Sequence, residues 1–157
     1  MTTNDIKLGN GIGELKFGMT RKQVKIILGE PDEIEQIEDD GETGASEAWH
    51  YDSKELSVTF DEEEEWRLTA MAASSASITF EGVDLLGLSQ EETMQQIELM
   101  NLGEIEIDDV IDEDEDRQQV ASIPEVSLNL WFDEGVLSEI QWGPFWDDEE
   151  ETYIWPE

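Results

Sequence analysis

The sequence contains no cysteine among its 157 residues. This absence excludes disulfides, thiolate metal sites, a cysteine nucleophile and lipidation through cysteine, and it is typical of proteins in a reducing compartment. Long hydrophobic runs are also missing, because no apolar stretch approaches the roughly 18–20 residues that span a bilayer. The first residues show no basic region followed by an apolar stretch, so no signal peptide is expected. We therefore expect a cytoplasmic protein with no membrane partner.

Basic residues are scarce, with 8 Lys and Arg against 42 Asp and Glu and a formal net charge of −34. Residues 1–25 contain five basic and two acidic side chains, a net +3, which leaves −37 for the rest of the chain. Such a field repels phosphate backbones and anionic membranes and attracts basic proteins. The composition therefore argues against direct nucleic-acid binding. General solubility, or adaptation to high salt, remains an alternative reason for the acidity.

Two segments of the chain match each other at an offset of 69 residues. Residues 13–20 and 82–89 both contain a glycine, four residues, a second glycine, an apolar residue and a hydroxyl residue. Thr20 and Ser89 are candidate N-caps, and Gln23 and Glu92 follow each cap by three residues. This spacing is that of the capping box, so we expect one helix to begin after each hydroxyl residue.

Each predicted helix has an apolar stripe at helical spacing. In the first helix the stripe consists of Val24, Ile27 and Leu28, and Gly29 with Pro31 ends the helix. In the second helix, which Gly103 should end, the stripe consists of Met94, Ile97 and either Leu99 or Met100.

A second match, at an offset of 72, relates two predicted strands, 56–62 and 128–134. Alternation assigns buried faces to Leu56, Val58 and Phe60 and to Leu128, Leu130 and Phe132. A turn and another strand follow each, over 66–73 and 136–142. Further strands are expected near 47–52, 76–80 and 104–109, and acidic loops over 37–46 and 110–122.

These patterns predict an α+β fold in one domain, 1–157. Two tandem repeats, 10–76 and 77–146, each a helix plus antiparallel strands, should form one antiparallel sheet with both helices on one face. An acidic C-terminal tail, 147–157, follows. The opposite sheet face is then exposed, and Trp131 points there by parity, where it suits an interface anchor.

The segment from Phe17 to Thr20, with Gln23, Val24 and Leu28 to Pro31, resembles a known helix signature. It is similar to the outer-membrane assembly lipoproteins of the SmpA/OmlA family and to the β-lactamase inhibitor protein family, whose fold is a tandem repeat. The stretches 127–134 and 140–144 resemble immunity proteins of polymorphic-toxin and contact-dependent inhibition systems. These resemblances imply a repeat scaffold used to bind protein, and in the immunity case a cognate toxin neutralised by occlusion.

Several motifs imitate chemical sites without completing them. The spacing from Gly13 to Gly18 begins like a phosphate-binding loop, but Met19 stands where lysine is required. Asp112, Asp114 and Asp116 imitate the start of an EF-hand loop, but Arg117 and Ile123 occupy the positions of its glycine and glutamate. His50, the one histidine, has no recognisable nucleophile or orienting partner nearby in sequence. We expect no catalytic residue, no metal and no cofactor.

The informative feature is the pairing of acidic with aromatic residues in two stretches, 61–66 and 142–151. We expect immunity-type inhibition of a basic nuclease toxin, with an RNase acting on tRNA as the leading case. Carboxylates would replace phosphates at the toxin's Lys and Arg, and aromatics would be desolvated anchors. The alternatives are a nucleic-acid mimic acting on a host or restriction enzyme and a hydrolase that uses carboxylates alone. The predicted partner-binding residues are Glu62, Glu63, Glu64, Trp66, Trp131, Trp142, Phe145, Trp146, Asp147, Asp148 and Glu149.

Overall fold

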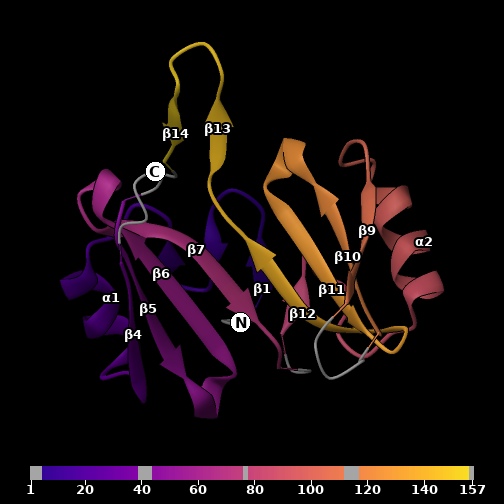
Figure 1. Ribbon diagram of the computed structural model, residues 1–157, viewed down its shortest axis with the longest axis horizontal. Helices are drawn as coiled ribbons and strands as arrows, with labels where there is room; N and C mark the ends of the chain where they lie inside the picture. Colours follow the sequence, from indigo (N-terminus) through magenta and orange to yellow (C-terminus); the bar gives the residue numbers. More distant parts are fainter. Residues whose placement is uncertain (1–4, 39–43, 76–77, 112–116, 156–157) are drawn as a thin grey trace.

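The computed structural model describes residues 5–38, 44–75, 78–111 and 117–155 of the chain, and its fold is α+β with mostly strands and two helices (Figure 1). An eight-stranded sheet in the order β4-β5-β6-β7-β12-β11-β10-β9 is antiparallel throughout. The strands of this sheet are β4 (Glu33–Ile37), β5 (Ser46–Tyr51), β6 (Leu56–Asp61), β7 (Arg67–Ala73), β9 (Glu106–Ile111), β10 (Arg117–Ile123), β11 (Leu128–Asp133) and β12 (Val136–Trp142).

The sequence predicted one sheet, but the structure contains two smaller ones as well. A four-stranded sheet joins β1 (Asp5–Lys7), β2 (Gly11–Ile12), β3 (Leu15–Lys16) and β8 (Thr79–Phe80), and β1 pairs with β8 in parallel. A hairpin is formed by β13 (Phe145–Asp147) and β14 (Thr152–Ile154). Strands of two or three residues carry too little alternation to be recognised, and β1 meets β8 only through tertiary pairing. The one-sheet prediction was therefore incomplete.

Both helices begin where the capping residues predicted. Thr20 and Gln23 form a complete capping box before α1 (Arg21–Leu28), and the Ser89 hydroxyl accepts the N–H of Glu92 at the start of α2 (Gln90–Met100). Gly29 caps α1 as expected. The second helix ends at Asn101 and not at Gly103, because Asn101 takes the left-handed conformation that closes a helix.

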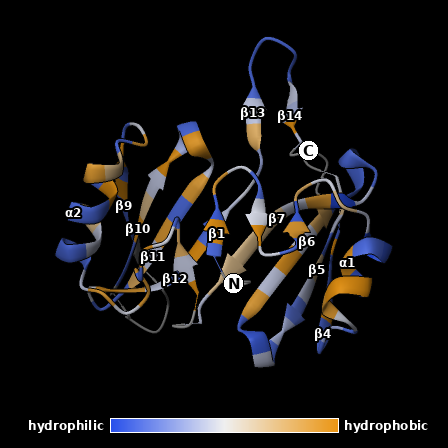
Figure 2. Cartoon of the chain, turned by 180° about the vertical axis from the view of Figure 1, so that it is seen from behind, coloured by the Kyte–Doolittle hydropathy of each residue, from blue (hydrophilic) through white to orange (hydrophobic). Residues whose placement is uncertain are grey.

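One hydrophobic core unites the sheet and the helices. Leu56, Val58 and Phe60 of β6 are buried at alternate positions, and Leu128, Leu130 and Phe132 of β11 follow the same pattern. The core also includes Val24 of α1 and Ile97 of α2. Figure 1 shows α1 and α2 at opposite flanks of the molecule, with β1 between them. Apolar and polar segments mix along the strands, whereas the tip of the β13–β14 hairpin is hydrophilic (Figure 2).

The predicted acidic loop over 110–122 was wrong for most of its length. Its later part is β10, where Ala121 and Ile123 are buried at alternate positions and pair with Leu130 and Leu128. The acidic and amide composition of this region hides a strand whose hydrogen bonds come from its neighbours on both sides. Asp112, Asp114 and Asp116 lie outside the described residues.

Candidate protein-binding surface

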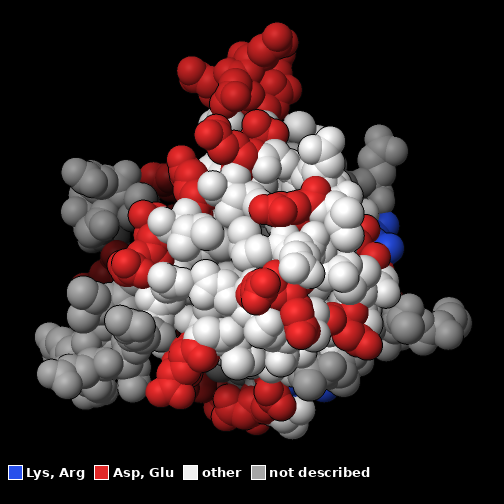
Figure 3. Space-filling view, turned by 90° about the vertical axis from the view of Figure 1, so that its right-hand side faces the viewer, with Lys and Arg blue, Asp and Glu red and all other residues white. Residues whose placement is uncertain are grey.

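The β13–β14 hairpin occupies much of the predicted acidic tail and projects beyond the main sheet (Figure 1). The Asp147 carboxylate accepts the backbone N–H groups of Glu149 at 3.0 Å and Glu150 at 3.3 Å, so an acidic side chain holds the turn. The hairpin tip gathers acidic side chains at the top of the view in Figure 3. Residues 147–154 are therefore an ordered acidic projection.

The hairpin carries aromatic rings below its acidic tip. Trp146 is 47% exposed, and its ring meets the edge of Tyr153 with centroids 5.1 Å apart. Tyr153 also lies beside Trp155, at 5.5 Å. Phe145 is half-buried, and its ring lies so close to Gly9 that any side chain there would collide with it. Phe145 therefore secures the hairpin base, and Trp146 is the ring available to a partner.

The structure brings the hairpin to the second acidic stretch, in the β6–β7 connection, where a 3-10 turn covers Glu62–Glu64. The Arg67 guanidinium, directly after this connection, lies 5.7 Å from the ring centroid of Trp155, so the two stretches meet. Burial, followed by the charges of Asp61, Glu64 and Glu63, raises the pKa of the Tyr153 hydroxyl. We call the surface made by 61–66 and 145–155 the acidic end. The sequence pointed to each stretch separately, and only the fold brings them together.

Trp66 belongs to the acidic end but is partly covered. The ring is half-buried, and the Arg21 guanidinium lies 4.7 Å from its centroid. Arg21 also contacts Glu47 at 3.3 Å, so its charge is already engaged. This stacking resembles the common use of an arginine plane over an indole.

Two predicted anchors lie elsewhere. Trp142 is 2% exposed and meets the edge of Phe17 with centroids 6.4 Å apart, so it belongs to the core and leaves the proposed surface. Trp131 is half-buried rather than freely exposed, and it pairs in the sheet with Val120 and Glu139. Parity correctly separated Trp131 from Leu130 and Phe132, but it could not reveal how far neighbouring strands cover the ring.

Among the predicted acids, Glu62, Glu63, Asp148 and Glu149 are exposed, whereas Glu64 and Asp147 are half-buried.

Tyr153 and Trp155 were missed by the sequence reasoning. They follow a run of acids near the chain end, where a solvated tail was expected. The signal was the symmetry around that run, because the apolar residues at 145, 146, 153 and 154 flank it at hairpin spacing.

His50 has neighbours that the sequence did not indicate. Its Nδ1 lies 2.8 Å from the Ser57 hydroxyl, and its Nε2 lies 3.4 Å from Glu35. Ser57 lies inside β6, paired with His50 of β5 and Ala72 of β7, where backbone N–H groups serve the sheet ladder. An acyl-transfer site would also need N–H groups aimed at an oxyanion, and the backbone of Ser57 is paired within the sheet on both sides.

No group of three or more His, Asp or Glu within the described ranges could hold a metal ion. No helix in the same part of the chain is long and apolar enough to cross a membrane.

No family model, curated protein or solved structure matches the chain.

Proposed function

We propose that this protein binds a basic protein through the acidic end and inhibits it by occlusion. The single observation that carries the proposal is the meeting of the two acidic stretches, where Arg67 lies against Trp155 and Tyr153 packs on the exposed ring of Trp146. Aromatic rings that lose water on binding, surrounded by charge, are the usual composition of an interface hot spot. A purely solubilising surface has no need of this arrangement.

The favoured partner is a basic nuclease toxin, an RNase acting on tRNA being the leading case, and the protein would then be its immunity protein. A nuclease holds phosphates with Lys and Arg, and carboxylates can occupy the same side chains. The net charge of −34 would attract such a partner over long distances and repel its nucleic acid. Binding would therefore compete with the substrate.

We also propose that the two four-stranded halves, β4–β7 and β9–β12, are copies of one unit with both helices on the same sheet face. Matching hydrogen bonds support this: Gly18 N–H to Leu68 O corresponds to Gly87 N–H to Leu137 O, at the offset of 69. The bulges after Thr59 and Trp131 correspond at the offset of 72. The burial of Val24 and Ile97 in one core supports the common face.

The test begins with the protein that the immobilised chain recovers from a lysate of its host, identified and purified. Stopped-flow association is then measured with a variant in which Asp148, Glu149, Glu150 and Glu151 become Asn or Gln. A matched control neutralises four exposed acids away from the acidic end, Asp84, Glu91, Glu98 and Glu104. We expect the hairpin variant to associate more slowly than the control and with a flatter salt dependence, because charges near the contact act most strongly.

Trp146→Ala should instead act on dissociation, because a buried ring contributes only after encounter. Removing a true anchor costs about 2 kcal/mol of binding free energy, which corresponds to a roughly 30-fold faster dissociation. Equal association by the hairpin and control variants, with wild-type dissociation of folded Trp146→Ala, would place the interface elsewhere. Recovery of a partner whose enzymatic activity is unaffected by the complex would refute occlusion.

A further inference from the structure

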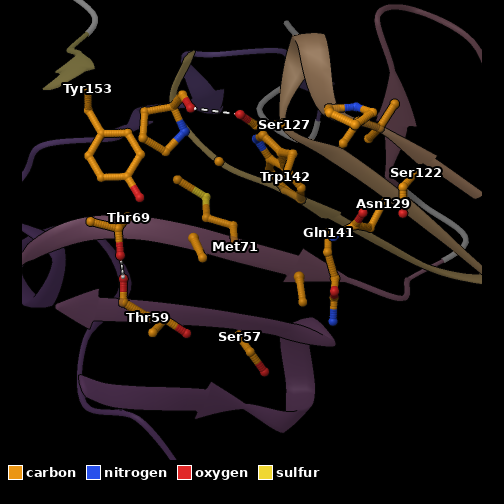
Figure 4. A pocket seen from close by; sticks show the side chains of 16 residues that line it. Ser57, Thr59, Thr69, Met71, Ser122, Ser127, Asn129, Gln141, Trp142 and Tyr153 are labelled. Carbon is orange, nitrogen blue, oxygen red and sulfur yellow. Dashed lines mark hydrogen bonds between the residues drawn. The ribbon is translucent and has the colours of Figure 1, made fainter. Parts of the chain in front are cut away.

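A second feature lies on the outer face of the main sheet, below the hairpin. A cavity of about 490 Å³ is lined by parts of β6, β7, β11 and β12, with Ser122 at the end of β10 and Tyr153 of the hairpin (Figure 4). It crosses the junction between β7 and β12, where the two halves of the sheet meet. Figure 4 shows Gln141 and Asn129 entering from one side and Ser57 and Thr59 from the other.

Among the residues that the structure describes, the 16 that line this cavity include no charged side chain. Charged residues make up 32% of the chain, so the lining differs sharply from the surface around it. A charged group of an occupant would be buried here without a charged partner, which is costly. Hydroxyl and amide groups can be buried at little cost once they are hydrogen-bonded. The lining therefore favours an uncharged occupant.

The cavity also offers unused hydrogen-bonding groups. The side chains of Thr59, Ser122 and Asn129 make no hydrogen bond to any other residue that the structure describes. Gln141 uses its amide N–H on Glu139, at 2.9 Å, and leaves its carbonyl oxygen available. Donors and acceptors of this kind recognise polar, uncharged groups such as a peptide backbone.

The extent of the cavity argues for a chain segment. It crosses four neighbouring strands, which at about 4.8 Å per strand spacing is roughly 14 Å. Four extended residues span a similar length, at about 3.3–3.6 Å each.

We infer that this cavity receives an uncharged polar loop of the same basic partner, with the acidic end holding the partner's charged surface beside it. The inference rests on the proposed function. Tyr153 connects the two regions, because it lines the cavity and also packs against Trp146. The acidic end would attract the partner, and the neutral cavity would select it by the shape and hydrogen bonds of one loop.

NMR can test the cavity without the native partner. The probe is a mixture of acetylated, amidated tetrapeptides built from Ser, Thr, Asn, Gln and Leu, at a total concentration of about 1 mM. The side-chain amide signals of Asn129 and Gln141 report on the cavity directly. We expect both to shift with added peptide, and a mixture of neutral sugars to leave them unchanged.

Asn129→Asp places a carboxylate in the cavity at nearly constant volume and should weaken peptide binding about tenfold. Thr59→Val should weaken peptide binding several-fold. Because valine favours β-strands, this variant keeps the test valid if Asn129→Asp fails to fold. Gln95→Glu adds the same charge on the exposed face of α2 and should have no effect. Absent shifts, shifts caused by sugars alone, or equal losses in Gln95→Glu would each overturn the inference.

The purified partner adds a test of sign. If charge alone drove binding, Asn129→Asp would tighten the complex, because it makes the protein more acidic. A loop seated in the cavity predicts weaker binding and faster dissociation. Tighter binding with intact hairpin effects would remove the cavity from the interface and leave the proposed function standing. Peptide binding in the cavity without any effect of the hairpin acids on partner binding would refute the proposed function and the assignment of the cavity to a basic partner, and would leave only a peptide-binding cavity.

Discussion

Glu47 shows how a single residue is stabilised in an acidic protein. Its side chain is buried, and it accepts hydrogen bonds from Trp49 Nε1 at 2.5 Å and Gln36 Nε2 at 2.7 Å, with Arg21 at 3.3 Å. Burial alone would raise the pKa of this carboxyl, but the two hydrogen bonds and the arginine outweigh it, and the pKa is lowered. Its ionised form is therefore favoured by folding.

Glu47→Gln should lower the free energy of unfolding by about 1–2 kcal/mol at pH 7. A lowered folded pKa gives stability that is present above the ordinary value of 4.5 and is lost as pH falls through the folded value. The difference between wild type and variant should therefore shrink towards pH 3, as measured by urea unfolding at each pH. A difference that stays constant or grows on acidification would contradict this account.

The packing of the β13–β14 hairpin can be tested by titrating Tyr153, because the chain has only two tyrosines and one of them can be removed. Burial, with the charges of Glu30 and Asp32, raises the pKa of Tyr51 to about 12, and Tyr51→Phe leaves Tyr153 as the single phenol to follow by ultraviolet absorbance. Tyr153 should titrate above the ordinary value of 10. Neutralising Glu63 and Glu64 to Gln should lower its pKa, because two of the charges that oppose ionisation are removed.

A matched pair of substitutions on α2, Glu91→Gln and Glu92→Gln, removes the same charge far from the hairpin. This control should leave the titration of Tyr153 nearly unchanged, since exposed charges beyond about 10 Å are screened at 0.1 M salt. If both pairs shift Tyr153 equally, the hairpin does not pack beside the β6–β7 connection.

Charge governs the behaviour of the whole molecule. Two of the few basic residues near the N-terminus are paired locally, Lys7 with Asp5 at 2.9 Å and Lys25 with Glu30 at 2.6 Å. They therefore do little to relieve repulsion elsewhere in a chain of net charge −34. Self-repulsion on this scale opposes the compact state.

Added salt should therefore stabilise the fold. Between about 10 mM and 1 M NaCl the Debye length falls from roughly 30 to 3 Å, and Tm measured by calorimetry should rise steadily. The variant with four neutralised hairpin acids should show a smaller rise, because less repulsion remains to be screened. Sucrose, which is uncharged, serves as the control for general solute effects. A Tm that is independent of salt would mean that the acids are spaced widely enough not to interact.

The sequence by itself determined the features that depend on neighbouring residues. Thr20 and Ser89 placed the helix starts, because a cap is satisfied within three residues. Alternation placed the buried faces of β6 and β11, because strand side chains alternate with a period of two.

Only the tertiary structure decided what depends on distant segments. It turned the later part of the loop expected over 110–122 into a strand, because β9 and β11 supply hydrogen bonds that the composition does not indicate. It packs Trp142 in the core against Phe17 and places Tyr153 near the carboxylates of the acidic end. It also left an uncharged cavity where the two halves meet. Such contacts join residues far apart along the chain, and no local pattern of charge or hydrophobicity records them.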